Sequence, residues 1–266
     1  MPQMDLQLNS RSALVTASTA GIGLEIARKL AVEGARVMLS GRSQAKLDQA
    51  VERIRAVGGT DVSGVLADPS TAEGANALVR AAPQVDILIN NLGIYEIKDF
   101  VDITDDEWRR YFEVNVLSGV RLARAYLPGM LQRNWGRIIF MSSEAGLVTP
   151  GPMIHYGMTK TAQLAISRGL AELTKGTNVT VNSVLPGPTR SEGVVDFLRS
   201  LASDRDAPAE QIEAEFFAKA EPTSLLQRMI EPEEIANLVA YVASPLSSAT
   251  NGAALRAEGG VVRTID

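Results

Sequence analysis

The chain has 266 residues, of which 45% are hydrophobic and 21% charged, with a formal net charge of −5 at pH 7. This composition is typical of a soluble globular protein with a sizeable core, and the absence of a run rich in lysine and arginine argues against nucleic acid as a partner. Because the chain contains no cysteine and one histidine, disulfides and thiolate ligands are excluded and we expect no metal site.

The beginning of the chain shows no basic segment followed by an apolar stretch. No apolar run approaches the length of about 18 residues that a membrane span needs. We therefore expect a cytoplasmic protein that has no membrane partner.

Short aliphatic or β-branched runs alternate along the chain with longer amphipathic stretches. The runs predict strands at 13–16, 36–40, 62–67, 85–90, 137–142, 179–185 and 253–258, and the apolar spacing between them predicts helices that include 23–34, 43–58, 105–127 and 156–173. Apolar strands that alternate with helices are typical of a parallel sheet buried on both faces. We expect an α/β fold in which residues 1–266 form a single domain, a doubly wound (Rossmann-type) sheet of about seven strands with helices on both faces.

The stretch 188–225 is less regular and too long for an ordinary connection. Long loops in compact domains often carry function, so we interpret it as a lid over the active site with short helices of its own. A surface insertion is the alternative.

A glycine-bearing turn, ASTAGIG, follows the first predicted strand and opens the next helix. Gly21 and Gly23 allow a ligand to approach the backbone closely and the helix to approach the sheet. The free N–H groups and positive dipole end of the helix suit a pyrophosphate. A βα turn without a ligand is the alternative reading.

Tyr156 and Lys160 lie four residues apart on one predicted helix, so their side chains face the same way. A tyrosine that acts as a base near pH 7 needs its pKa lowered by about three units, or roughly 4 kcal/mol. A cation about 4 Å away supplies on the order of 4 kcal/mol at an effective dielectric constant near 20. The spacing therefore predicts an acid–base tyrosine with a pKa lowered by lysine, against the alternative of a helix-surface pair.

The turn from Thr16 to Gly23 resembles the TGxxxGxG motif of the short-chain dehydrogenase/reductase family, with Ala17 where the first glycine usually stands. Tyr156 and Lys160 match the family's YxxxK motif, and the resemblance, which includes the 3-oxoacyl-carrier-protein reductases, runs from residue 11 to about residue 262.

The resemblance implies a catalytic set of Asn115, Ser143, Tyr156 and Lys160. Ser143 would hydrogen-bond the substrate oxygen, and Asn115 would hold a water beside the lysine. It also implies a cofactor-binding set that contains Tyr156 and Lys160 together with Thr16, Ser18, Thr19, Gly21, Ile22, Gly23, Arg42, Asp68, Asn91, Gly93, Pro186, Gly187 and Thr189.

The end of the second predicted strand bears on the choice of cofactor. A carboxylate there would bind the ribose hydroxyls of NAD and repel a 2′-phosphate, but the position is occupied by Gly41. Arg42 follows and offers a forked cationic donor to a phosphate. We therefore expect NADP(H), with NAD possible and with an exposed, non-discriminating Arg42 as the alternative.

The implied activity is an oxidoreductase that transfers a hydride between NADP(H) and a small-molecule carbonyl or secondary alcohol, with Tyr156 as general acid/base. The alternatives are a non-catalytic dinucleotide-sensing protein on the same fold and an NAD-dependent sugar or polyol dehydrogenase. The family resemblance also implies a homotetramer built on the helices at 105–130 and 156–173. Apolar positions in the first of them belong either to that interface or to the core of the monomer: Val114, Leu117, Val120 and Leu122.

Several further residues invite an interpretation. His155 is expected to pack rather than to act beside Tyr156, because adjacent helix positions face different directions. Glu144 is expected at the rim of the substrate pocket, where a carboxylate would prefer a cationic or hydroxyl-bearing substrate. The Met and Phe residues of 216–230 are assigned to the core of the lid, and Glu258-Gly259-Gly260 to a structural role.

Overall fold

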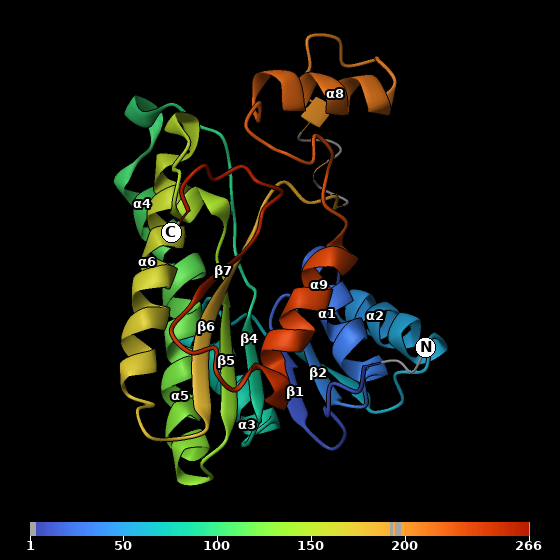
Figure 1. Cartoon of the computed structure of the whole chain (residues 1–266), viewed down its shortest axis with the longest axis vertical. Helices are drawn as coiled ribbons and strands as arrows, with labels where there is room; N and C mark the ends of the chain where they lie inside the picture. The colour runs from blue at the N-terminus through green and yellow to red at the C-terminus, as the bar shows by residue number, and fades with distance from the viewer. Residues whose placement is uncertain (1–3, 192–193, 195–197, 200, 266) are drawn as a thin grey trace.

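The sheet predicted from the alternating pattern is present in the computed structural model, which describes residues 4–191, 194, 198–199 and 201–265. Within these residues the strands are all parallel and form one sheet in the order β3-β2-β1-β4-β5-β6-β7 (Figure 1). Their bounds are β1 Ser12–Val15, β2 Arg36–Gly41, β3 Val62–Leu66, β4 Ile87–Asn90, β5 Gly136–Met141, β6 Val179–Pro186 and β7 Ala254–Ala257. The strand order reverses between β1 and β4, and open α/β sheets bind ligands at the carboxyl ends of the strands beside such a reversal.

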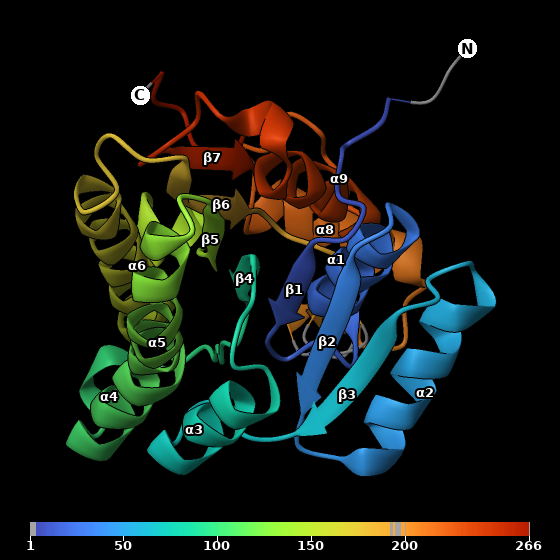
Figure 2. The ribbon, with the colours of Figure 1, turned by 90° about the horizontal axis from the view of Figure 1, so that it is seen from below.

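Helices cover both faces of the sheet, as the doubly wound fold requires (Figure 2). One layer contains α1 (Gly21–Val32), α2 (Gln44–Ala56) and α9 (Pro232–Ala243), and the other contains α3 (Ala72–Ala81), α5 (Ser118–Gln132) and α6 (Ile154–Glu172). Each face has a core of its own between the helices and the largely aliphatic strands. Among the described residues, no helix combines the length and the hydropathy needed to cross a bilayer.

The helix predicted at 105–127 is interrupted in the structure. It consists of α4 (Asp105–Phe112), a π-helical turn (Glu113–Leu117) and then α5, which continues past Pro128 to Gln132. Leu122 is fully buried in the core between α5 and the sheet, whereas Val120 is only partly buried. The burial of Leu122 within the monomer explains its apolar character without an oligomer interface.

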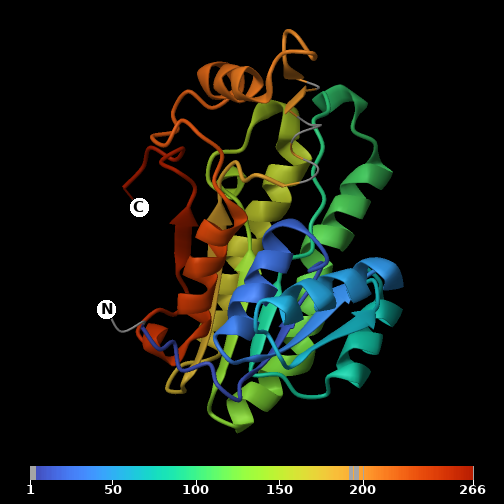
Figure 3. The same cartoon turned by 90° about the vertical axis from the view of Figure 1, so that its right-hand side faces the viewer.

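The 188–225 segment follows the carboxyl end of β6 and carries α8 (Ala209–Lys219) beyond the ends of the strands (Figures 1 and 3). Its apolar side chains, among them Phe217, form a small core of their own together with Met229, which follows the segment. The backbone N–H of Leu225 donates to the carbonyl of Gly259 at 2.7 Å, which joins the base of the segment to the chain after β7. Residues 192–193, 195–197 and 200 of this predicted lid lie outside the described residues.

Candidate active site

Two cavities lie side by side at the carboxyl ends of the strands. One, of about 680 Å³, lies beyond β1, β2 and β3 and is lined by the turns that follow them. The other, of about 480 Å³, lies beyond β4, β5 and β6, and the 188–225 segment forms part of its wall. Gly93 borders both, so the two cavities meet at this residue.

The glycine turn between β1 and α1 has a backbone that excludes side chains at two positions. Gly21 adopts φ +55°, and a Cβ on Gly23 would lie 2.5 Å from both the carbonyl oxygen of Ala17 and Nδ2 of Asn91. Nδ2 of Asn91 donates to the carbonyls of Thr16 (3.0 Å) and Ala17 (3.1 Å). Ala17 itself adopts φ 51° and so reproduces the left-handed turn without the usual glycine.

Two hydroxyl groups of the predicted cofactor set stabilise this turn from the side that faces away from the cavities. Ser18 is fully buried, and its Oγ donates to the carbonyl of Val15 at 2.8 Å and accepts from the N–H of Ser40 at 3.2 Å. Oγ1 of Thr16 accepts from the N–H of Asn91 at 2.8 Å. Both hydroxyls are therefore used to shape the turn and to join it to β2 and β4, and neither residue lines a cavity.

The larger cavity brings together four residues named for the nucleotide end of the cofactor or for its choice: Thr19, Gly41, Arg42 and Asp68. A Cβ on Gly41 would lie 2.6 Å from Cγ2 of Thr19, so a side chain there would collide with the glycine turn. The Arg42 side chain is 79% exposed, with its guanidinium 3.9 Å from Oδ2 of Asp68, and it is free to turn toward the cavity.

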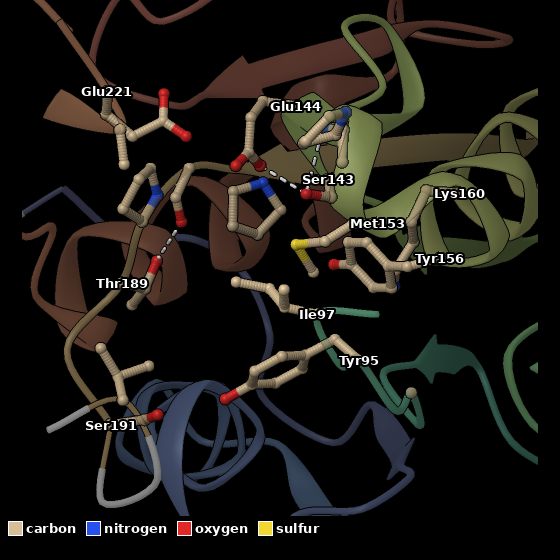
Figure 4. A pocket seen from close by; sticks show the side chains of 18 of the residues that line it. Tyr95, Ile97, Ser143, Glu144, Met153, Tyr156, Lys160, Thr189, Ser191 and Glu221 are labelled. Atoms are coloured by element: carbon tan, nitrogen blue, oxygen red, sulfur yellow. Dashed lines mark hydrogen bonds between the residues drawn. The ribbon is translucent and has the colours of Figure 1, made fainter. Parts of the chain in front are cut away.

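The smaller cavity contains the predicted catalytic serine, tyrosine and lysine (Figure 4). Ser143 follows β5, where its Oγ accepts from the N–H of Ala145 at 3.2 Å and donates to the carboxylate of Glu144 in a short hydrogen bond. Tyr156 lies on the first turn of α6, and its phenol lines the same cavity close to Ser143. The chain thus places two hydroxyls from different elements at one point of the cavity wall.

Lys160 lies one turn further along α6 and is 4% exposed. Its Nζ donates to the carbonyl of Met141 at 2.8 Å and lies 5.5 Å from the centroid of the Tyr156 ring. Burial lowers the pKa of Lys160 to about 8, against the opposing charge of Glu144. The ammonium is therefore held under the tyrosine rather than beside its hydroxyl.

The pKa of Tyr156 moves upward, not downward. Burial raises the pKa of the phenol above its ordinary value, the charge of Glu144 raises it further, and the hydrogen bond with Ser143 opposes both. The net direction is therefore opposite to the one expected from Lys160 alone, because burial of the phenol disfavours its ionised form.

Asn115 lies on the π-helical turn between α4 and α5 and is 1% exposed. Its Oδ1 accepts from the N–H of Ile94 at 2.8 Å, and its Nδ2 donates to the carbonyl of Ile94 (3.0 Å) and to Oγ1 of Thr159 (2.9 Å). The side chain therefore ties the loop after β4 to α6, next to Lys160, and both of its polar atoms have protein partners.

The turn after β6 completes the wall of the smaller cavity with Pro186, Gly187 and Thr189. Oγ1 of Thr189 donates to the carbonyl of Gly187 at 2.8 Å. A Cβ on Gly187 would lie 2.5 Å from the carbonyl oxygen of Glu258, so the segment after β7 packs directly against this turn. Glu258 is buried and accepts from the N–H groups of Val261 and Val262, in agreement with a structural role.

The only histidine of the chain is turned away from both cavities. His155 is 1% exposed, and its ring packs 4.0 Å from the ring of Tyr111 and 6.1 Å from that of Trp108, measured between centroids. Burial lowers the pKa of the imidazole. This geometry confirms that the residue packs.

Of the predicted site residues, five lie behind the cavity walls: Thr16, Ser18, Gly21, Gly23 and Asn115. The others line one cavity or both. Sequence reasoning did not find several lining residues that belong to no motif, two on helices and three on loops: Arg110 on α4, Arg121 on α5, and Tyr95, Ser191 and Glu221. Their positions depend on tertiary packing, and no local spacing marks them.

A family model described as short chain dehydrogenase matches residues 11–200, which include the glycine turn and the residues around Tyr156. The chain belongs to the short-chain dehydrogenase family. The resemblance read from the motifs is thereby confirmed, and so are the parallel sheet and its helices on both faces.

Known relatives of this short-chain dehydrogenase cover nearly its whole length. It is 51% identical to the uncharacterized oxidoreductase YvaG of Bacillus subtilis (strain 168), over 98% of this chain and 100% of the relative. It is 32% identical to the D-beta-hydroxybutyrate dehydrogenase of Cupriavidus necator, over 96% and 99% of the two chains. Its fold matches that of L-sorbose reductase from Gluconobacter frateurii, solved with NADPH and L-sorbose, with a TM-score of 0.92, 30% identity and coverage of 98% and 100%.

Proposed function

We propose that this short-chain dehydrogenase interconverts a carbonyl compound and the corresponding secondary alcohol with NADP(H), and that Tyr156 is its general acid/base. The observation that carries the proposal is the convergence of Ser143, Tyr156 and Lys160 on a cavity that meets a second, nucleotide-sized cavity at Gly93. Substrates named for two relatives, a hydroxy acid and a keto sugar, share the reacting group that such a site serves.

The residues present fit a nicotinamide dinucleotide. The backbone at Gly23 leaves no room for a side chain, and Gly21 adopts a positive φ that side chains disfavour. Ala20, the residue before α1, makes no side-chain cap that would cover the free N–H groups of the helix. Asn91, Gly93, Gly187 and Thr189 would hold the nicotinamide end. When bound, a nicotinamide supplies or accepts the hydride.

The choice of NADP(H) rests on Arg42 and Gly41. A side chain at Gly41 would meet Thr19, so the carboxylate that would select NAD has no place there. The exposed guanidinium of Arg42 can offer paired donors to a 2′-phosphate. The L-sorbose reductase with a similar fold was solved with NADPH, which agrees with this choice.

The proton chemistry follows from the side chains of the smaller cavity. In the proposed reaction the Ser143 hydroxyl would turn from Glu144 to donate a hydrogen bond to the substrate oxygen, where it would stabilise developing negative charge. Tyr156 transfers its phenolic proton to that oxygen. Burial raises the pKa of Tyr156, so without cofactor the phenol is protonated at neutral pH, which is the form that can give a proton to a carbonyl oxygen.

Lys160 and Asn115 act around this pair. The Lys160 ammonium, fixed by the carbonyl of Met141, would reach the cofactor ribose and replenish the proton of Tyr156. Asn115 bonds both to the loop that follows β4 and to α6, and so it fixes their separation. It is therefore a positioning residue in this scheme. The 188–225 segment would act as the lid of a single-domain enzyme.

Two alternative functions predict different results with NADPH and NADH. A non-catalytic dinucleotide-sensing protein would bind NADPH without turnover, and an NAD-dependent sugar or polyol dehydrogenase would prefer NADH. The hydroxyls of Ser143 and Tyr156 lie together on the cavity wall, which favours an enzyme, because a sensor needs no proton donor there.

Replacement of Tyr156 by phenylalanine tests the proposal. We expect Tyr156→Phe to lower the rate of NADPH oxidation, measured with a panel of aldehydes and ketones, by about 10²- to 10⁴-fold, because proton transfer contributes an effect of that order. NADPH affinity, measured by fluorescence titration, should change little, because the substitution keeps the aromatic ring and leaves the larger cavity, where the nucleotide would bind, unchanged.

The matched control is Tyr95→Phe, which removes a phenol from the same cavity. The Tyr95 hydroxyl bonds to Ser191 on the opposite wall, away from Ser143, so this variant should keep most of the turnover number (Figure 4). Equal turnover in wild type and Tyr156→Phe would refute the acid–base assignment, and NADPH binding without turnover on any carbonyl would favour the sensor.

A further inference from the structure

Two carboxylates face one another at the end of the substrate cavity. Glu144 comes directly after Ser143, and Glu221 comes from the 188–225 segment, just after α8. Figure 4 shows the carboxylate of Glu144 joined to the hydroxyl of Ser143 by a hydrogen bond, and the carboxylate of Glu221 turned toward Glu144 from the neighbouring wall. The two groups are close enough that the charge of Glu221 raises the pKa of Glu144.

The rest of this cavity is chemically plain. Apart from the reacting hydroxyls, its described lining is mostly apolar and includes Ile97, Met153 and Phe216. Lys160 is the only lysine or arginine among the described lining residues, and its Nζ is bound to the carbonyl of Met141. A substrate carboxylate would therefore meet two carboxylates and find no accessible cation within the described wall.

We propose that Glu144 and Glu221 select an uncharged, hydroxyl-bearing carbonyl substrate and reject substrates that carry a carboxylate remote from the reacting carbon. This inference rests on the proposed function and narrows it from carbonyl compounds in general to polyhydroxy ketones and their alcohols.

Hydroxyl groups suit this pair of carboxyls for a simple chemical reason. An ionised carboxylate accepts hydrogen bonds from two hydroxyls, and a protonated one also donates. Burial, and less strongly the nearby Glu221, raises the pKa of Glu144 to about 7, so that near neutral pH the pair holds both forms. Polyols present donors and acceptors on adjacent carbons, which match such a pair.

A matched pair of substrates tests the inference. L-sorbose and 5-keto-D-gluconate share one carbon skeleton, and the second carries a carboxylate in place of the terminal hydroxymethyl group far from the ketone. We expect the wild-type enzyme with NADPH to show a kcat/KM at least about tenfold higher for L-sorbose, a ratio that corresponds to about 1.4 kcal/mol. An unhydroxylated neutral ketone, cyclohexanone, should be a poorer substrate than L-sorbose.

Variants of Glu221 test whether its charge causes the discrimination between L-sorbose and the keto acid. Glu221→Gln should bring the two kcat/KM values closer by several-fold, and Glu221→Lys should favour the keto acid. Glu210→Gln is the matched control, because Glu210 is exposed on α8 and does not line the cavity, and its substrate ratio should equal that of wild type. Thermal unfolding of each variant verifies that the fold is retained.

The possible failures can be told apart. If no carbonyl compound supports NADPH oxidation, the proposed function fails and this inference fails with it. If cyclohexanone is reduced but L-sorbose is not, or if the keto acid is reduced as well as L-sorbose, the proposed function stands and the inference is overturned. Preference for an amino ketone over both sugars would also overturn it, since the pair would then select a cation.

Discussion

Ala17 carries a β-carbon in a part of the backbone map where glycine is usual. At φ 51° a residue with a side chain bears a cost of roughly 1 to 2 kcal/mol. The turn nevertheless closes, because Nδ2 of Asn91 donates to the carbonyls of both Thr16 and Ala17. The missing glycine of the family motif is therefore compensated by neighbouring hydrogen bonds.

Replacing Ala17 by glycine removes this strain. Glycine also gives the unfolded chain more freedom, which costs about 0.5 to 1 kcal/mol, so we expect Ala17→Gly to raise the free energy of unfolding by about 0.5 to 1 kcal/mol. Urea titration measures the change. The control is Ala20→Gly, at φ −158°, where only the entropic cost applies and stability should fall; a loss of stability in both variants would contradict the strain.

Glu144 makes the stability of the folded chain depend on pH. Its pKa rises from the ordinary 4.5 to about 7 on folding, chiefly through burial, so the folded state binds the proton more tightly than the unfolded state. Stability from this group is therefore present below about pH 4.5 and is lost as pH rises to about 7. Since the side chain is partly exposed, the loss is about 2 kcal/mol rather than the larger value that full burial would give.

Glu144→Gln should abolish this loss. We expect the variant without cofactor to be more stable than wild type by about 2 kcal/mol at pH 8.5 and nearly equal to it at pH 4.5. Chemical unfolding at the two pH values measures both differences. A difference of the same size at both would show that the carboxyl does not titrate in this range.

At the scale of the elements, the strands and their order along the chain could be predicted, because hydrophobic periodicity is a local property of the sequence. The predicted strand at 85–90 begins two residues late in the structure, at Ile87, and the predicted helix at 156–173 begins two residues early, at Ile154. The π-helical turn at Asn115 was not predicted, since one extra residue per turn leaves the apolar pattern almost unchanged.

The site shows the same division. Ser143, Tyr156 and Lys160 could be placed because motif spacing fixes them to the end of β5 and one face of α6. The position of Glu221 near Glu144 could not be predicted, because tertiary packing and not local sequence determines the conformation of a loop of this length. The pKa of Tyr156 was also beyond the sequence, because burial, which decides its direction, is a property of the whole cavity.

The turn from β2 to α2 decides the cofactor in the proposed function. We expect Arg42→Ala to raise the KM for NADPH about tenfold to a hundredfold while that for NADH changes little, because the lost contact is a charge-assisted hydrogen bond to a phosphate. Steady-state kinetics with both cofactors measure the change. Arg80→Ala is the control, because Arg80 is exposed at the end of α3 and lines neither cavity; an unchanged KM for NADPH in Arg42→Ala would remove the basis for NADP(H).

At the scale of the whole molecule, we propose that four copies assemble through α5 and α6. Val114, Leu117 and Val120 are only partly buried in the monomer, unlike Leu122, and Leu173, which follows α6 directly, is 62% exposed. Partly exposed aliphatic residues on long neighbouring helices are consistent with an interface, although scattered exposed leucines are common.

Val120→Glu tests the assembly. Light scattering after gel filtration should give the mass of four chains for wild type and a smaller species for the variant, since a buried charge without a partner opposes association. Val32→Glu, on the exposed side of α1, is the matched control and should leave the mass unchanged. A wild-type mass of one chain would exclude the tetramer.

The hydrogen bonds from Leu225 and Leu226 to Gly259 have a practical consequence for work with this protein. They anchor the wall of the substrate cavity to the strip of chain that follows β7, only a few residues before the carboxyl terminus. A substitution in this strip, which lines neither cavity, would therefore disturb the wall of the substrate cavity.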